Sequence, residues 1–146
     1  MKSEISSGPA RWMLVDDDNN LRRTIAKLIA ALAGVEVTEF SSGAAALSAL
    51  TAAPDTFGFV VSDLDMPGMS GIEFCRRLKA SRPDLKVLLA TGSGVITEPE
   101  ARAYGFCGLI SKPFSVATLR CVIADAGLTK IHQPVQAGVA PVCLAA

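Results

Sequence analysis

The feature that most constrains the fold is a short apolar run that ends in carboxylates. Residues 59–63 read Phe-Val-Val-Ser-Asp, and Leu-Asp-Met-Pro-Gly follows at residues 64–68. The run is too short for a helix and rich in β-branched and aromatic residues, and Pro-Gly ends any regular element. It therefore predicts a buried strand that brings Asp63 to the edge of a sheet. Taken alone, Asp63 and Asp65 are equally typical of an ordinary turn before Pro-Gly.

The same kind of run recurs along the chain. Four further segments have the length and composition of strands: residues 12–15, 35–40, 86–90 and 108–111. Five segments with helical spacing or helix-capping residues alternate with the strands: residues 21–32, the stretch from Ser42 to Pro54, the stretch from Ser70 to Arg82, residues 98–104 and residues 116–127. Strands that alternate with helices at this spacing predict an α/β domain with a parallel sheet.

Polar residues stand at the ends of four of these apolar strands. In chain order they are Asp16 with Asp17, then Asp63, Thr91 and Lys112. In a parallel α/β sheet the carboxyl ends of the strands share one edge, where ligands bind. Each residue has an ordinary alternative, such as a helix cap, a surface cation or a strand-end hydroxyl. Only the combination predicts a site.

The charges of this set indicate its chemistry. Two carboxylates about 4 Å apart repel by roughly 4 kcal/mol at an effective dielectric near 20. Three acids with one lysine form a negative pocket that favours a hard divalent cation, and oxygen ligands favour Mg²⁺ or Mn²⁺. A carboxylate there is also a potential nucleophile toward phosphorus. Lys112 and the Thr91 hydroxyl could hold further phosphoryl oxygens, and Gly92 leaves room for a donor.

The chain resembles the receiver domains of two-component response regulators over residues 11–127. The resemblance rests on four motifs in order: Leu14-Val15-Asp16-Asp17, the stretch from Ser62 to Gly71, Leu89-Ala90-Thr91-Gly92, and Ser111-Lys112-Pro113-Phe114. It implies a flavodoxin-like (βα)5 three-layer sandwich whose five-stranded parallel sheet has the order 2-1-3-4-5. It also implies a single-domain regulator or a receiver of a hybrid histidine kinase.

The resemblance further implies a role for each site residue. Asp63 is the expected phosphoacceptor, which takes its phosphoryl group from a histidine kinase or a histidine phosphotransfer protein. Asp17 is expected to hold Mg²⁺ directly and Asp16 through water, with Asp63 and the backbone carbonyl of Asp65 as further ligands. Thr91 and Lys112 match the switch hydroxyl and the phosphate-pairing lysine. Such a domain is a signalling receiver and not an enzyme in the usual sense.

One departure from the family pattern bears on the output. Receivers usually carry an aromatic residue three positions before the lysine, which swings inward when the threonine moves, but here that residue is Leu109. An aromatic swing is therefore excluded, and a phosphorylation-independent interaction module of receiver fold stays open as an alternative. A remote alternative is a phosphatase of the haloacid-dehalogenase type, suggested by Asp63-Leu64-Asp65. There the Asp-x-Asp motif normally follows the first strand, whereas here it follows the third.

Composition sets the remaining limits. With 14 basic and 14 acidic residues and no basic run, the chain predicts no direct binding of nucleic acid. It has no apolar stretch of membrane-spanning length and no signal-peptide core, and its scattered cysteines predict reduced thiols, so we expect a cytoplasmic protein. We expect residues 1–10 to form a loose leader and residues 128–146 a disordered tail that is too short for an output domain, so that the signal leaves through a protein partner.

Overall fold

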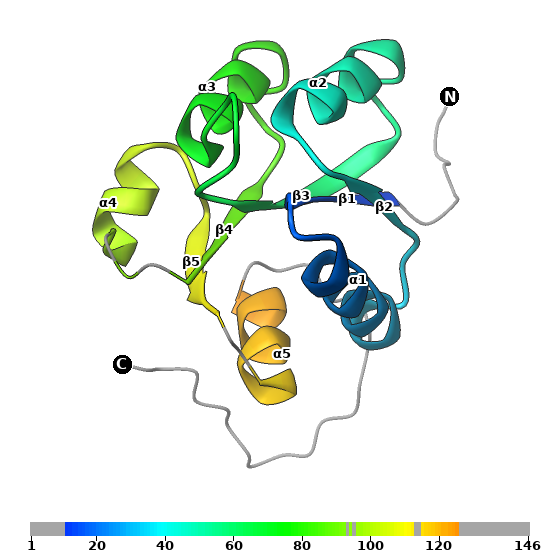
Figure 1. Ribbon diagram of the computed structural model, residues 1–146, viewed down its shortest axis with the longest axis vertical. Helices are drawn as coiled ribbons and strands as arrows, with labels where there is room; N and C mark the ends of the chain where they lie inside the picture. Colours follow the sequence, from blue (N-terminus) through cyan, green and yellow to red (C-terminus); the bar gives the residue numbers. More distant parts are fainter. Residues whose placement is uncertain (1–10, 93, 95, 113–114, 126–146) are drawn as a thin grey trace, which may run out of the picture.

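The computed structural model describes residues 11–92, 94, 96–112 and 115–125, which form one parallel sheet between two layers of helices (Figure 1). The strand order is β2-β1-β3-β4-β5, and every pair of neighbours is parallel. The strands are β1 (Arg11–Val15), β2 (Val37–Phe40), β3 (Phe57–Asp63), β4 (Val87–Thr91) and β5 (Gly108–Ser111). The predicted flavodoxin-like α/β fold and its strand order are confirmed.

The helices cover both faces of the sheet. They are α1 (Asn19–Ala33), α2 (Gly43–Ala52), α3 (Gly71–Ser81), α4 (Glu98–Ala103) and α5 (Val116–Asp125). Figure 1 shows α1 and α5 on one face and α2, α3 and α4 on the other. In the described part of the chain, no helix is both long enough and apolar enough to cross a membrane.

The sheet is buried on both sides because alternate residues of each strand point to opposite faces. Met13 and Val15 belong to the core under α2, α3 and α4, whereas Trp12 and Leu14 belong to the core under α1 and α5. Near-continuous apolar strands are typical of parallel sheets that are covered by helices on both faces. The polar positions at the strand ends therefore stand out against an apolar sheet.

Side-chain caps fix where the helices begin. The side chain of Asp18 accepts a hydrogen bond from the backbone nitrogen of Leu21, and Ser42 and Ser70 cap α2 and α3 in the same way. Gly34 ends α1 in the left-handed conformation with φ of 67°. The three side-chain caps set the length of the loops at the carboxyl edge of the sheet.

Several strand boundaries differ from the predicted ones: β1 begins one residue earlier, at Arg11, and β4 covers Val87–Thr91 instead of residues 86–90. Strand β2 begins at Val37 and not at Val35, and β3 begins at Phe57, two residues before the apolar run. Alternation in the sequence marks which residues suit a strand, but pairing with β1 decides which of them join the sheet. The expected leader, residues 1–10, and the expected tail, residues 128–146, lie outside the described residues.

Candidate functional site

The predicted site residues come from the carboxyl ends of four different strands. Asp16 directly follows β1, Asp63 ends β3, Thr91 ends β4 and Lys112 directly follows β5. Strands β1 and β3 are neighbours in the sheet, so Asp16 and Asp63 are brought together although a strand and two helices separate them in sequence. The parallel topology thus gathers the predicted site at one edge.

Three carboxylates form an acidic cluster at this edge. Asp16, Asp17 and Asp63 each offer one oxygen, and these atoms all lie within 4.8 Å of one another. Asp16 and Asp63 are 2% and 9% exposed, whereas Asp17 is exposed at the rim. Since like charges this close repel, the cluster needs a cation to balance it.

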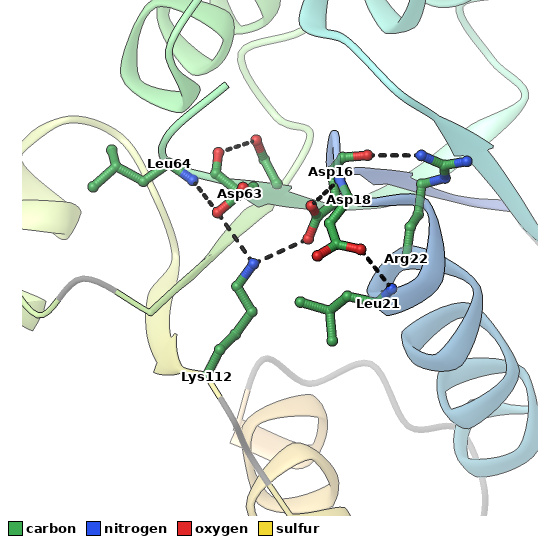
Figure 2. Close-up of polar contacts among 8 residues, drawn as sticks. Asp16, Asp18, Leu21, Arg22, Asp63, Leu64 and Lys112 are labelled. Carbon is green, nitrogen blue, oxygen red and sulfur yellow. Dashed lines mark hydrogen bonds and ion pairs between the residues drawn. The ribbon is translucent and has the colours of Figure 1, made fainter. Parts of the chain in front are cut away.

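Lys112 supplies one such cation from across the sheet. Its Nζ atom lies 3.0 Å from Oδ2 of Asp16 and 3.2 Å from Oδ1 of Asp63 (Figure 2). Burial lowers the pKa of Lys112, but hydrogen bonds and charge attraction from Asp16 and Asp63 outweigh it, so the pKa lies above its ordinary value. Lys112 is therefore firmly charged at neutral pH.

The surroundings of the Asp63 carboxyl have opposing effects on its pKa. Burial raises its pKa, and although Lys112 opposes that effect, the charge of Asp16 adds to it, so the pKa lies above its ordinary value. The backbone N–H of Leu64 donates a hydrogen bond of 2.8 Å to Oδ1 (Figure 2). Hydrogen bonds thus hold the charged carboxylate in place, but its negative charge is not fully balanced. This favours the binding of a further cation, or the formation of a bond at one of its oxygens.

Thr91 and Asp65 complete the set of predicted residues. Thr91 is 1% exposed and lies on the strand next to Asp63, and its carbonyl oxygen accepts a hydrogen bond of 2.9 Å from the backbone nitrogen of Lys112. The ends of β4 and β5 are thereby tied together. Asp65 is exposed in the loop between β3 and α3, two residues beyond Asp63.

Arg22 of α1, which belongs to none of the four sequence motifs, also supports the site. The Arg22 guanidinium donates a hydrogen bond of 2.9 Å to the Asp16 carbonyl (Figure 2). It also pairs with Glu39 at 3.0 Å. It therefore ties the β1–α1 turn to β2. Arg22 and the exposed Arg23 are adjacent polar residues outside the apolar positions of α1, so the helical periodicity alone could not distinguish the two.

The donor set of the acidic cluster fits a hard divalent cation. Its side-chain donors are carboxylate oxygens, which suit Mg²⁺ or Mn²⁺ better than softer metals. Asp17 stands at the exposed rim, so water can complete the coordination that Mg²⁺ requires. With one lysine against three acids, the cluster retains negative charge that a cation would neutralise.

Comparison with known proteins decides the family. The family model described as "Response regulator receiver domain" matches residues 13–124. The chain belongs to the response regulator receiver family. Members of this family are signalling modules of two-component systems, and all four sequence motifs fall within or overlap the matched region.

Curated receivers show where such a domain occurs. The chain is 38% identical over 110 residues to the response regulator receiver protein CpdR of Brucella abortus, covering 75% of this chain and 89% of CpdR. It is 40% identical to the C4-dicarboxylate transport transcriptional regulatory protein DctD of Rhizobium meliloti, covering 79% of this chain but 24% of DctD. It thus spans most of one receiver relative and only a quarter of the other.

Solved receivers share the fold. A response regulator receiver domain protein from Clostridium thermocellum superposes with a TM-score of 0.73 at 27% identity, covering 80% of this chain and 93% of that one. The Vibrio cholerae chemotaxis protein CheY4 gives 0.70 at 28% identity, covering 81% and 98%. The superpositions therefore span most of the length of both receiver structures.

The departure at Leu109 is located on β5. Its side chain is partly buried and packs against the core under α2, α3 and α4.

Cys75, Cys107 and Cys121 carry free thiols, and burial raises the pKa of Cys75 to about 11. The predicted reduced state of these three cysteines is consistent with this arrangement, and Cys143 lies outside the described residues.

Proposed function

We propose that this receiver takes a phosphoryl group onto Asp63 from a phosphohistidine of a histidine kinase or histidine phosphotransfer protein. The observation that carries the proposal is the convergence of Asp16, Asp17, Asp63 and Lys112 at one sheet edge, with carboxylate oxygens within 4.8 Å and the lysine at 3.0 and 3.2 Å. In this step an oxygen of Asp63 forms a bond to phosphorus, the phosphorus–nitrogen bond breaks and the imidazole leaves with the electron pair.

Mg²⁺ fits this proposal as the cofactor. Asp16, Asp17, Asp63 and the backbone carbonyl of Asp65 are the groups that would hold it. When bound, it supplies positive charge that balances the oxygens of the transferring phosphoryl group. The acidic cluster supports this assignment because the only cation bonded to it among the described side chains, Lys112, leaves it negative.

The chain's own residues prepare the acceptor. The Leu64 N–H and the Lys112 ammonium hold one carboxylate oxygen of Asp63, which fixes the orientation of the nucleophile. After transfer, Lys112 remains close enough to pair with a phosphoryl oxygen, and the hydroxyl of Thr91 from the neighbouring strand supplies a second donor. Gly92 carries no side chain beside them, and a Cβ added there would make only ordinary contacts with Lys112, at 3.7 and 3.8 Å.

The proposal includes the setting of the domain. The receiver spans residues 11–127, with a leader at residues 1–10 and a tail at residues 128–146, and acts in the cytoplasm.

DctD is a transcriptional regulatory protein, but the matched region is only 24% of it. We propose that this receiver passes its signal to a protein partner rather than binding nucleic acid itself, and that it does not turn over phosphate esters.

Intact-mass measurement tests the proposal. The protein is incubated with Mg²⁺ and acetyl phosphate beside Asp63→Asn and, as a matched control, Asp55→Asn, which removes an exposed carboxylate. We expect one phosphoryl adduct in the wild type and the control, and none in Asp63→Asn or without metal. Labelling of Asp63→Asn would refute the acceptor assignment. Multiple turnover of a generic phosphate ester would favour the phosphatase.

A second candidate function is a phosphorylation-independent interaction module, and the observation that favours it is Leu109 in place of an aromatic switch residue. If neither acetyl phosphate nor phosphoramidate labels the protein and Mg²⁺ does not bind in a calorimetric titration, this candidate is preferred. Binding of Mg²⁺ with labelling at Asp63 excludes it as the sole function.

A further inference from the structure

The peptide unit that joins Asp63 to Leu64 is held on both of its sides. Its N–H donates to Oδ1 of the Asp63 carboxylate at 2.8 Å (Figure 2). Its carbonyl oxygen accepts a hydrogen bond of 2.9 Å from the hydroxyl of Ser62, which is fully buried. Because the unit is planar, a rotation that moves the carbonyl also moves the N–H away from the carboxylate.

Gly71, in the first turn of α3, packs against the Asp63 carbonyl oxygen and bonds to the next carbonyl along the chain. Its N–H donates a hydrogen bond of 2.8 Å to the carbonyl of Leu64. A Cβ atom at Gly71 would lie less than 3.0 Å from the Asp63 carbonyl oxygen and 3.0 Å from the Leu64 Cα. Both neighbours are backbone atoms, which cannot rotate away as the end of a side chain can.

We infer that Gly71 and Ser62 are positioning residues that aim the Asp63–Leu64 peptide N–H at the acceptor carboxylate. The inference deepens the proposed function and rests on Asp63 being the acceptor. Ser62 holds the carbonyl by a hydrogen bond, and the missing side chain of Gly71 lets the start of α3 pack directly on it. The same contact closes the loop of residues 64–70 onto β3, and this loop carries Asp65, whose carbonyl is the proposed metal ligand.

Other glycines show that this requirement is local. A Cβ at Gly108, which is buried in β5, would meet Leu88 Cδ1 at 3.5 Å, an ordinary contact. A Cβ at Gly43 would meet the Met69 sulfur at 3.0 Å, the flexible part of a side chain. Gly71 has a negative φ like these two, so its need for glycine comes from space and not from backbone conformation.

The test compares Gly71→Ala with Gly108→Ala in the full chain. We expect Gly71→Ala to slow labelling by acetyl phosphate at saturating Mg²⁺ on the order of tenfold to a hundredfold, since a misplaced reacting group costs this much. Gly108→Ala should label at the wild-type rate. Equal rates for the two variants would overturn the inference.

A second readout does not depend on phosphorylation. In the metal-free protein, we expect the Leu64 amide proton to resonate upfield and exchange faster in Gly71→Ala, because its hydrogen bond to Asp63 is lost, while Gly108→Ala leaves it unchanged. An unchanged Leu64 amide in folded Gly71→Ala would overturn the inference. If the wild type itself is not labelled, the proposed function fails, and the amide measurement still decides the positioning role.

Ser62→Ala covers the case in which Gly71→Ala does not fold. This variant removes only the hydroxyl that holds the Asp63 carbonyl and leaves the close approach of α3 in place. We expect the same shift of the Leu64 amide and a smaller loss of labelling rate, of roughly threefold to tenfold, as for one hydrogen bond. Wild-type behaviour of Ser62→Ala in both readouts would overturn the inference.

Discussion

The ammonium nitrogen of Lys112 lies 3.0 Å from Oδ2 of Asp16, although 96 residues separate the two in sequence. The same nitrogen lies 3.2 Å from Asp63, so one side chain just after β5 balances two buried carboxylates at the ends of β1 and β3. These two ion pairs link the ends of three strands of the sheet. It also places the cation where a phosphoryl group on Asp63 would need one.

Lys112→Ala should therefore lower stability when no metal is present. The substitution leaves two buried carboxylates facing one another, and breaking a buried pair by removing one partner costs about 3 kcal/mol. We expect chemical denaturation to show this loss, and Mg²⁺ to recover part of it. Lys27→Ala, which removes an exposed lysine, is the control. A variant as stable as wild type without metal would contradict the prediction.

The pH dependence of stability should report on Asp63. Its pKa is raised in the folded state, so the folded protein binds this proton more tightly than the unfolded chain does. The resulting stabilisation is present below about pH 3.9, the unfolded pKa, and is lost as pH rises through the folded pKa. Asp63→Asn, which stays uncharged, should therefore gain stability relative to wild type over this range.

Denaturation curves between pH 4 and pH 8 without metal measure that difference. We expect Asp63→Asn to be more stable than wild type at neutral pH, and Mg²⁺ to stabilise the wild type more strongly than the variant. A wild type that is more stable than Asp63→Asn at neutral pH without metal would show that Lys112 compensates the buried charge fully.

Asp17 and Asp18 offer a matched pair for the metal site. Asp17 contributes to the acidic cluster, whereas the carboxylate of Asp18 caps α1 through the Leu21 nitrogen at 3.0 Å. We expect Asp17→Asn to weaken Mg²⁺ binding on the order of a hundredfold, since outer ligand partners alone contribute tenfold or more. Asp18→Asn keeps a capping side chain and should bind nearly as wild type. Calorimetric titration separates the two, and equal affinities would refute the cluster as the metal site.

Most of the site could be predicted because its members stand at strand ends. Asp63, Thr91 and Lys112 interrupt apolar runs, and a parallel sheet brings such ends to one edge whatever the loops do. The order of the strands could not be predicted from these runs, because the sequences of β2 and β5 do not show which edge of the sheet each strand occupies. The prediction of that order came from the family resemblance and is confirmed.

Sequence reasoning missed the residues whose role depends on close approach. Arg22 has the spacing of a solvated arginine, yet it binds the Asp16 carbonyl, and only the position of β1 beside α1 shows this. Gly71 occupies an ordinary helical position after a capping serine, and its tight contact with Asp63 exists only in the folded chain. Local patterns predict elements and their ends, but they do not predict which backbone atoms touch.

Arg22 can be tested against its exposed neighbour. Arg22→Met removes hydrogen bonds to the Asp16 carbonyl and to Glu39 from a side chain that is 12% exposed, so we expect a loss of about 2 kcal/mol in unfolding free energy. Arg23→Met removes an exposed charge and should change stability by less than about 0.5 kcal/mol. Equal effects in chemical denaturation would mean that the guanidinium contacts contribute no more than a solvated charge.

Leu109 determines how far phosphorylation can reshape the output face. Its partly buried side chain packs against the core under α2, α3 and α4, and a leucine has no aromatic ring to exchange between solvent and core. We expect phosphorylation of Asp63 to shift amide resonances of Thr91 and its strand neighbours, while the methyl groups of Leu109 keep the same core contacts. Paired spectra with and without Mg²⁺ and acetyl phosphate measure both.

Two variants of Leu109 separate packing from switching. Leu109→Ala should cost about 1 to 2 kcal/mol in stability, as for a partly buried leucine, without changing the labelling rate of Asp63 or the Thr91 shifts. Leu109→Tyr restores an aromatic ring at this position and should extend the phosphorylation-dependent shifts along β5 and into α4. If Leu109→Ala instead abolishes the response at Thr91, the leucine itself moves during switching. The coupling between acceptor and output face would then run through an aliphatic side chain.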